Sequence, residues 1–532
     1  MASPFSAETR EATLAALETA ELDVLVVGGG ITGAGVARDA VLRGLRVGLV
    51  EAVDFAAGTS SRSSKLIHGG VRYLQQGEVA LVRESATERA VLRRLAPHLA
   101  EPVVMLIPTY GRASQAKLGV GLWTFDRIAS IPPDERHEII GHDEALRREP
   151  TLDGRLYGAV LFTEYRTCDA RLVLATMRGA HAAGALCVNH AALVGLSRGE
   201  ATVRDELTGR TRRVRARVVV NAAGPWVDAV RGMTGPITGA RLHLTKGVHL
   251  VVPHERLPIR HAVVMAARDK RSIFAVPRGA ATYLGTTDTD HGPPALNPAI
   301  TAEDADYLLE AAHRTFAGTP LTRADVVGAW AGLRPLLHEE GKSPSEISRR
   351  DEIMVGNDGV VAVAGGKLTT HRRMAERVVD LVYERLGRRP APSRTAEVVL
   401  PGGERSPAEL RALAGELERV LPRLGRLGVE RLIMHHGADA ARFAGPEATV
   451  LPGSTPVLEA EVVAAVDEEM ALTLEDVLDR RLRLLYFDVH QGLDVVEPVA
   501  ALVARRLGWD TARTGREIAA YRQLAESLRR FP

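Results

Sequence analysis

The chain has 532 residues, which is too long for one hydrophobic core and predicts two or three domains. Its net charge of +2 is too small to indicate nucleic-acid binding, and its two cysteines exclude a disulfide scaffold and offer no metal-ligand spacing, so we expect no metal site. No apolar run reaches the roughly 18–20 residues of a transmembrane helix, and residues 1–21 lack the apolar core of a signal peptide. We therefore expect a protein that does not span a membrane, although it can still lie on one.

A glycine-rich motif follows the first apolar run of the chain. The run Asp23–Val27 predicts a buried strand, and Gly28, Gly30 and Gly33 follow it at G-x-G-x-x-G spacing. The three glycines permit a tight turn, a close approach to a pyrophosphate, and close packing of the next helix, whose N-terminus favours an anion. A second apolar run ends in Glu51, which is placed to bind ribose hydroxyls. The pattern predicts a dinucleotide site; a position near the N-terminus favours FAD over NAD, and a glycine-rich turn without a ligand is the alternative.

The next stretch is rich in hydroxyl groups and then becomes basic. Thr59, Ser60, Ser64 and Lys65 lie in it, and its hydroxyls and backbone donors can hold a diphosphate or the edge of a flavin ring. A solvated serine-rich linker is the alternative. The apolar and glycine residues around His68 favour the buried loop, because a linker does not need them.

Three later segments carry further signals, and two of them concern the dinucleotide site. Residues 117–131 are apolar and can contact a membrane or a quinone, but we favour a helix of the core. The strand that ends in Asn221-Ala-Ala-Gly224 and the strand that enters Gly365-Gly366-Lys367 are both expected to return beside the dinucleotide site. Lys367 and the amides of the helix after it are suited to stabilise negative charge on a reduced flavin.

The pattern of elements predicts an α/β fold. We expect a Rossmann-like FAD-binding domain, an antiparallel-sheet substrate or cap domain, and a mostly helical C-terminal domain. Residues 1–395 form the oxidoreductase core in this prediction, and residues 396–532 the helical domain. The FAD-binding segments are about 20–80, 170–245 and 330–390, interleaved with cap segments about 81–169 and 246–329.

The chain resembles the FAD-dependent glycerol-3-phosphate dehydrogenases, the respiratory type that passes electrons to quinone. The specific resemblance lies in Thr59-Ser-Ser-Arg-Ser-Ser-Lys-Leu-Ile-His-Gly-Gly-Val-Arg-Tyr-Leu74 and in Gly365-Gly-Lys-Leu-Thr-Thr370. Further matches are Asn221-Ala-Ala-Gly-Pro-Trp226, Lys246-Gly-Val-His-Leu-Val-Val-Pro253, Leu284-Gly-Thr-Thr-Asp288, Gly332-Leu-Arg-Pro335 and Leu474-Glu-Asp-Val-Leu-Asp-Arg-Arg481. The resemblance therefore covers nearly the whole chain.

The resemblance implies a set of site residues. The substrate-binding residues that it implies are Arg72, Tyr73, Arg334, Arg349 and Lys367. The positive charges of the arginines and the lysine suit a phosphate. The cofactor-binding residues, from the motifs and the resemblance together, are Gly28, Gly30, Ile31, Thr32, Gly33, Glu51, Thr59, Ser60, Ser64, Lys65, Ala222, Gly224, Gly366, Lys367, Leu368 and Thr369.

The catalytic residues that we expect are His68, His249, Arg334 and Lys367. A histidine has a pKa suited to take the hydroxyl proton while hydride passes to the flavin, and His68 is the first candidate and His249 the second. Arg334 and Lys367 would lie near the flavin and the carbinol oxygen. A role for either histidine in orientation only stays open.

The resemblance implies oxidation of sn-glycerol 3-phosphate to dihydroxyacetone phosphate on FAD, with membrane quinone as the acceptor. It also implies a cytoplasmic homodimer, peripheral on the inner face of the cell membrane. Alternatives are an oxidase that uses O₂, a related 2-hydroxy-acid or amino-acid oxidase, and a flavin-binding protein without turnover. The presence of Arg72, Arg334 and Lys367 disfavours the last of these.

Overall fold

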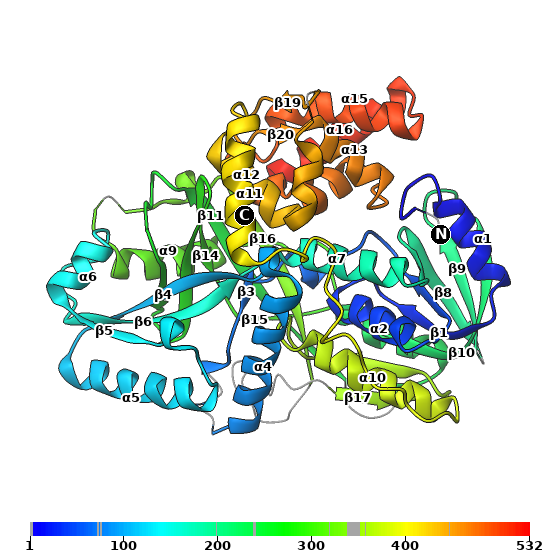
Figure 1. The fold of residues 1–532 in the computed structure, drawn as a ribbon, viewed down its shortest axis with the longest axis horizontal. Helices are drawn as coiled ribbons and strands as arrows, with labels where there is room; N and C mark the ends of the chain where they lie inside the picture. The colour runs from blue at the N-terminus through cyan, green and yellow to red at the C-terminus, as the bar shows by residue number, and fades with distance from the viewer. Residues whose placement is uncertain are drawn as a thin grey trace.

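The computed structural model describes residues 4–71, 74, 77–197, 199–237, 241–318, 320–337, 352–356, 358–445 and 447–531. Two sheets lie side by side, and a helical region formed by the end of the chain covers them (Figure 1). Across these residues no helix is both long and apolar enough to cross a membrane.

The first sheet is built around the strand that precedes the glycine motif. β1 (Leu22–Val27) is buried along its whole length and pairs in parallel with β2 (Val47–Val50) and β10 (Thr211–Asn221). The sheet continues through β7 (Leu186–Val188) beyond β2, and through β18 (Val361–Ala364) and the antiparallel β17 (Glu352–Val355) beyond β10. An antiparallel extension pairs β8 (Ala191–Ser197) with β9 (Glu200–Asp205) and β9 with β10.

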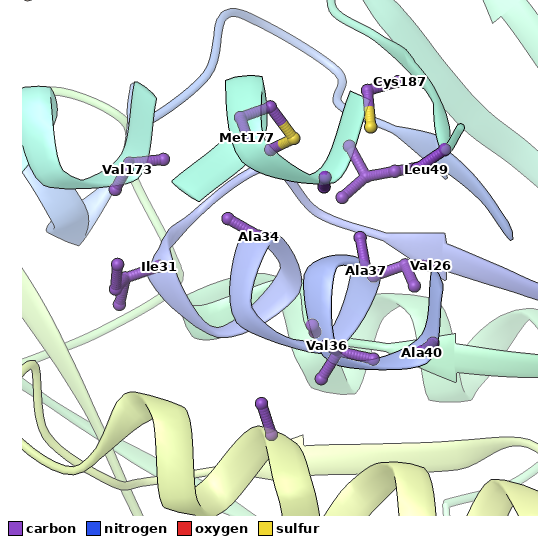
Figure 2. Packing of buried hydrophobic residues seen from close by; sticks show 14 of the residues in the cluster. Val26, Ile31, Ala34, Val36, Ala37, Ala40, Leu49, Val173, Met177 and Cys187 are labelled. Carbon is purple, nitrogen blue, oxygen red and sulfur yellow. The ribbon is translucent and has the colours of Figure 1, made fainter. Parts of the chain in front are cut away.

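Three helices pack together on this sheet. α2 (Ile31–Leu42) lies between α7 (Asp169–Ala182) and α10 (His371–Arg385), as Figure 2 shows. Small residues make this possible: Ala34 and Ala37 face α7, while a Cβ on Gly35 would lie 3.2 Å from the Cβ of Ala375 in α10. Close packing of α2 brings its N-terminus to the end of β1, where a ligand is expected to bind.

The second sheet is mainly antiparallel, with one parallel pair. Its strands are β3 (Leu66–Ile67), β4 (Glu101–Thr109), β5 (Glu138–Gly141), β6 (Gly158–Arg166), β11 (Leu242–Pro253), β12 (Ala262–Ala266), β13 (Ser272–Arg278), β14 (Ala281–Gly285), β15 (Thr289–His291) and β16 (Gly328–Leu337). The parallel pair is β4 with β12. The remaining helices of the core are α1 (Arg10–Thr19), α4 (Val79–Leu95), α5 (Arg112–Ile128), α6 (His142–Arg148), α8 (Val227–Arg231) and α9 (Ala302–Thr315).

The C-terminal region packs on one face of the second sheet. Its elements are α11 (Pro407–Val420), α12 (Gly425–His436), β19 (Val450–Leu451), β20 (Val457–Leu458), α13 (Glu459–Asp467), the π-helical turn η8 (Asp476–Arg481), α14 (Leu484–Phe487), α15 (Val496–Leu507) and α16 (Thr511–Ser527). Tyr283 and Trp330 of the sheet share one apolar core with Leu478 and Tyr486 of this region. α9 covers the other face of the sheet.

The predicted fold class is confirmed, and three details differ from prediction. β3 and β16 pair within the second sheet, although the prediction placed residues 20–80 and 330–390 in the FAD-binding segments; the other domain boundaries stay predictions. The helix expected in residues 117–131 is present as α5, and Leu122 and Phe125 pack in the core as expected, but Val120 and Trp123 on its other face are exposed. Five charged residues of Leu472–Leu485, expected on an outer helix face, are buried: Asp476, Asp479, Arg480, Arg481 and Arg483.

Candidate functional site

The site lies at the carboxyl ends of the parallel strands, where β1 has β2 on one side and β10 on the other. Gly28 has φ +110°, and a Cβ there would lie 2.5 Å from the carbonyl oxygen of Ala222, at the end of β10. A Cβ on Gly33 would lie 1.9 Å from the carbonyl oxygen of Gly28. Both positions therefore require glycine, and the turn brings the backbone of β10 against the motif as expected.

The N-terminus of α2 forms the floor of this turn. Ile31, Thr32 and Gly33 make up its first helical turn, and Gly30 is the N-cap, so no side chain of the N-cap residue competes for the helix amides. Ser60 Oγ accepts the N–H of Ile31 at 3.0 Å, and a Cβ on Gly30 would meet the same oxygen at 3.1 Å. The hydroxyl-rich loop thus lies directly on the glycine turn.

Glu51 closes the other side of the turn at the end of β2. Its two carboxylate oxygens accept the N–H of Gly29 at 2.6 Å and the N–H of Val53 at 2.8 Å. Burial raises the pKa of this carboxyl above its ordinary value, so further donors brought by a ligand would stabilise its charged form. Hydroxyl groups of a ribose are such donors.

The hydroxyl-rich loop also contacts the second sheet. Thr59 Oγ1 donates to the carbonyl oxygen of Leu333 in β16 at 2.6 Å. A Cβ on Gly332 would lie 2.8 Å from the carbonyl oxygen of Arg62. Because glycine lets β16 approach the loop this closely, the two sheets meet at the site.

A row of residues crosses the second sheet at this point. Phe274 of β13, Gly285 of β14, His249 of β11 and Trp330 of β16 stand opposite one another in register. The His249 and Trp330 rings stack with centroids 4.7 Å apart and planes 11° apart. The imidazole leans over Gly285, where a Cβ would lie 2.0 Å from His249 Cδ2, so the glycine makes room for the histidine.

His249 is buried and held in one orientation. Its Nε2 lies 2.9 Å from Ser64 Oγ, and its buried Nδ1 has no hydrogen-bond partner within the described part of the chain. Burial, with the nearby charges of Lys65 and Arg334, holds the pKa of His249 well below its ordinary value. The imidazole is therefore neutral at pH 7.

His68 lies at the same face of the sheet. Its ring centroid is 5.5 Å from that of Phe274, and its side chain is 39% exposed. His68 Nδ1 is 3.8 Å from a carboxylate oxygen of Glu164, which is itself paired with Arg89 at 3.1 Å. Burial alone would raise the pKa of Glu164, but His68 and Arg89 hold it below its ordinary value.

Arg334 lies four residues after Trp330 on β16. Its guanidinium donates to Asp288 Oδ1 at 2.8 Å and to Thr286 Oγ1 at 3.1 Å. A Cβ on Gly247 would lie 2.3 Å from Arg334 Nη2, so the arginine extends over a position that only glycine leaves open, two residues from His249. The structure thus brings Arg334 and His249 together on one face.

The remaining predicted cofactor residues lie just after the ends of two strands of the first sheet. Gly224 follows β10 with φ +55°, and Gly366 follows β18 with φ +79°. Lys367, Leu368 and Thr369 then form the turn into α10, where the carbonyl oxygen of Leu368 accepts a hydrogen bond from His371 Nδ1 at 2.8 Å. Because β18 and β10 are parallel neighbours, both turns lie at the same edge of the sheet.

Lys65 has a different setting from the other predicted cofactor residues. Its ammonium is fully buried and donates to Asp169 Oδ2 at 2.8 Å, to the carbonyl oxygen of Ser61 at 2.7 Å and to that of Ser63 at 3.2 Å. These three acceptors match its three donors, which indicates that Lys65 shapes the loop. Its direct contact with a cofactor stays a prediction. The predicted substrate residues Arg72, Tyr73 and Arg349 lie outside the described residues.

Several residues that hold this site have no role predicted from the sequence. Asp288 and Thr286 orient Arg334, Glu164 pairs with His68, and Trp330 stacks on His249. Asp288 and Thr286 lie in a segment that carries the family resemblance, which is the one signal that pointed to them. The register between β11 and β16 is not readable from the sequence, so the stacked Trp330 was not predictable.

The residues of the first sheet fit an adenine dinucleotide. The glycine positions leave a turn that a Cβ would fill, the helix N-terminus suits a pyrophosphate, and Glu51 suits a ribose. The buried, unpartnered Nδ1 of His249 shows that the second sheet presents a polar atom with unused hydrogen-bonding capacity.

Comparison with known families agrees with this geometry. A family described as FAD dependent oxidoreductase matches residues 23–381, and one described as the C-terminal domain of alpha-glycerophosphate oxidase matches residues 393–514. The chain is 38% identical over 527 residues to the aerobic glycerol-3-phosphate dehydrogenase of Bacillus subtilis, with 95% of each chain covered. It is 37% identical to the protein of the same name from Staphylococcus aureus, with 93% of each chain covered.

Solved structures give the same result. The glycerol-3-phosphate dehydrogenase from Bacillus halodurans, complexed with FAD, is similar with a TM-score of 0.82 and 34% identity, covering 99% of each chain. The L-alpha-glycerophosphate oxidase from Mycoplasma pneumoniae shares the fold, with a TM-score of 0.56 and 17% identity over 72% of this chain and 100% of that chain.

Proposed function

Because the chain belongs to the family of FAD-dependent glycerol-3-phosphate dehydrogenases, we propose that it oxidises sn-glycerol 3-phosphate to dihydroxyacetone phosphate. The cofactor is FAD, which supplies a hydride acceptor when bound. One observation carries the proposal: Arg334 and His249 lie on one face of the second sheet, directly against the loop that lies on the dinucleotide turn.

The proposed roles follow from the surroundings of each residue. We assign Nε2–H of His249 as the donor to Ser64 Oγ, 2.9 Å away. In this tautomer the Nδ1 lone pair would take the C2 hydroxyl proton while C2 gives up its hydride. A neutral imidazole suits this task, and this setting favours His249 over His68 as the base. Arg334, fixed by Asp288 and Thr286, orients the anionic substrate and stabilises charge at the carbinol oxygen.

The substrate phosphate would be held by the positive charges of Lys367, Arg72 and Arg349 and by the Tyr73 hydroxyl, the set that the family resemblance implies. Lys367 ends the β18 turn at the cofactor edge of the first sheet, which supports a position near both the phosphate and the flavin. These assignments remain part of the proposal.

We further propose that the electrons pass to a membrane quinone and that the protein binds the inner face of the cell membrane from the cytoplasm. The surface of α5 supports this. Val120 is 66% exposed and Trp123 52%, with Lys117 and Arg127 exposed beside them. The sole carboxylate of α5, Asp126, is buried and bonded to His137. An apolar and basic helix face of this kind suits an anionic lipid surface. A homodimer stays a prediction.

Arg334→Ala tests the substrate site. We expect kcat/KM for glycerol 3-phosphate to fall by about 10²–10³, because a fixed charge at the reacting oxygen is lost, while bound FAD is retained. Turnover is measured with a soluble dye acceptor and compared with Arg215→Ala, whose side chain is 78% exposed on β10. Equal activity in the two variants would remove Arg334 from the site.

Hydrogen peroxide formed with O₂ at a rate equal to quinone reduction would favour an oxidase.

A further inference from the structure

The C-terminal segment Asp476–Arg483 carries charged side chains that are almost completely buried. Asp476 and Asp479 are 0% exposed, Arg480 and Arg481 1%, and Arg483 2%. Buried charges are costly unless they are paired and hydrogen-bonded, so their partners indicate what the segment holds. Those partners include residues of the two loops that border the dinucleotide turn.

The first partner is Asp54, three residues after Glu51. Arg480 Nε lies 2.6 Å from Asp54 Oδ2, and both nitrogens at the end of the Arg481 guanidinium bond the same carboxylate, Nη2 at 3.0 Å. The loop around Asp54 is in turn part of the cofactor turn, because Val53 N–H donates to Glu51 and Ala56 N–H donates to the carbonyl oxygen of Gly29 at 3.0 Å.

The second partner is the hydroxyl-rich loop. Arg483 Nη2 donates to the carbonyl oxygen of Ser61 at 3.1 Å and lies 3.4 Å from Asp169 Oδ1. Lys65 donates to the same two groups, at 2.7 Å and 2.8 Å. Ser60, one residue before this carbonyl group, accepts the amide of Ile31 at the start of α2. Arg483 therefore fixes the backbone next to Ser60, which is a predicted cofactor-binding residue.

The local backbone of the segment serves this arrangement. Residues Asp476–Arg481 form a π-helical turn, and Arg483 has φ +59°, a left-handed conformation that is uncommon outside glycine. The π turn and the left-handed residue let Arg480, Arg481 and Arg483 all reach the core of the protein.

We propose that Arg480, Arg481 and Arg483 are positioning residues for FAD: the C-terminal domain holds the loops at Asp54 and Ser61 in the conformation that retains the cofactor. The arginines themselves touch neither cofactor nor substrate. They set the positions of Glu51, at the ribose, and of Ser60, at the N-terminus of α2. This rests on FAD as the cofactor and does not depend on the substrate or the electron acceptor.

The same cluster offers the ligand geometry of a metal site, since atoms of Asp54, His190 and Asp476 lie within 4.8 Å of one another. The guanidinium group of Arg480 already bonds the carboxylates of Asp54 and Asp476, and that of Arg481 bonds Asp54 as well. Positive charge is thus supplied by the arginines, and the cluster is accounted for by loop positioning without a cation.

The test is FAD release from the purified holoenzyme. Arg481→Gln and Arg483→Gln remove one loop contact each, and Arg431→Gln is the matched control. Arg431 forms a buried two-point ion pair with Glu461, at 2.8 Å and 2.6 Å, entirely within the C-terminal domain. Each protein is diluted at a temperature where circular dichroism shows it folded, and the rise in free-flavin fluorescence gives the release rate.

We expect release at least about tenfold faster for Arg481→Gln and Arg483→Gln, and within about twofold of wild type for Arg431→Gln. Arg483→Lys, which keeps the charge and can still donate to Ser61 and Asp169, should retain FAD better than Arg483→Gln, and it replaces that variant if the glutamine protein does not fold. Backbone hydrogen exchange in residues 52–65 should rise in the loop variants alone. Release rates equal to that of Arg431→Gln, or unchanged exchange in residues 52–65, would overturn the proposal.

Discussion

At the residue scale, the proposed mechanism rests on one neutral histidine. His249 is held between the Trp330 ring and Ser64 Oγ, and burial keeps the pKa of its imidazole well below the ordinary value of about 6.5. A base of this kind is in its proton-accepting form over the whole neutral range. His68 is more exposed and is paired with the buried Glu164, which suits a role in orientation.

His249→Gln should lower kcat by about 10²–10⁴ with FAD still bound, because the group that accepts the hydroxyl proton is lost. The same change at His68 is the control and should cost less. The wild-type kcat/KM profile should show no acid limb near pH 6.5, since the folded-state pKa of His249 lies well below that value. A larger loss of kcat in the His68 variant than in His249→Gln would reverse the assignment of the two histidines.

Individual residues could be predicted from the sequence where the backbone conformation allows only one residue type. Gly28 and Gly33 were predicted from spacing, and each occupies a position where a Cβ would meet a backbone oxygen. Lys65 was predicted as a cofactor residue from its loop, and its full burial against Asp169 depends on α7, which is distant in the sequence. A one-dimensional pattern carries no information about such a partner.

At the element scale, α5 shows how an amphipathic helix can be misread. Its apolar residues suggested a core helix, and the buried ones are Gly119, Leu122 and Phe125. Val120 and Trp123 are also apolar, but their side chains are exposed. The guanidinium carbon of Arg127 lies 4.8 Å from the centre of the Trp123 ring. The outward face is therefore both apolar and basic. In Figure 1 this helix lies well apart from the C-terminal helices.

The double change Val120→Glu with Trp123→Glu should abolish binding to vesicles that contain anionic lipid, because it removes apolar contact and adds repulsion. Quinone reduction in those vesicles should fall, while turnover with a soluble dye should stay near wild type. Co-sedimentation with the vesicles measures binding. The control is Val194→Glu, an exposed apolar residue on β8. Unchanged co-sedimentation in the double variant would exclude α5 as the membrane contact.

At the scale of the whole molecule, buried ion pairs join the C-terminal region to the core. Arg171 of α7 donates to both oxygens of Glu469 at 2.6 Å, and both side chains are buried. Burial would raise the pKa of Glu469, but the Arg171 charge and these hydrogen bonds lower it to about 2. The folded-state pKa is thus below the ordinary value, so this pair stabilises the fold above about pH 4.5 and is lost as pH falls toward 2.

The melting temperature should therefore fall as the pH is lowered from about 4.5 to 2. Glu469→Gln should lower the melting temperature at pH 7 by several degrees, because it leaves Arg171 buried without a charged partner. The variant should also show a shallower decline with acid than wild type, since one of the titrating groups is gone. Differential scanning fluorimetry across this pH range measures both effects. Parallel acid curves for the two proteins would contradict the role given to this pair.

The sequence predicted three parts of the molecule and the order in which they occur, because glycine turns and buried strands have local signatures. It did not predict how the C-terminal part is joined to the core. The spacing of Asp476 and Arg480 predicts an outer, solvated helix face. In the structure they are buried against Asp54 and His190, through contacts between segments more than 280 residues apart.

The central claim is that a bound flavin is reduced by glycerol 3-phosphate at the meeting point of the two sheets. The most direct measurement is the visible spectrum of the purified protein, recorded without oxygen before and after sn-glycerol 3-phosphate is added. We predict a flavin band at about 450 nm that bleaches with glycerol 3-phosphate and not with glycerol, because the proposed basic pocket binds the phosphate. A flavin band that glycerol 3-phosphate leaves unchanged would contradict the account.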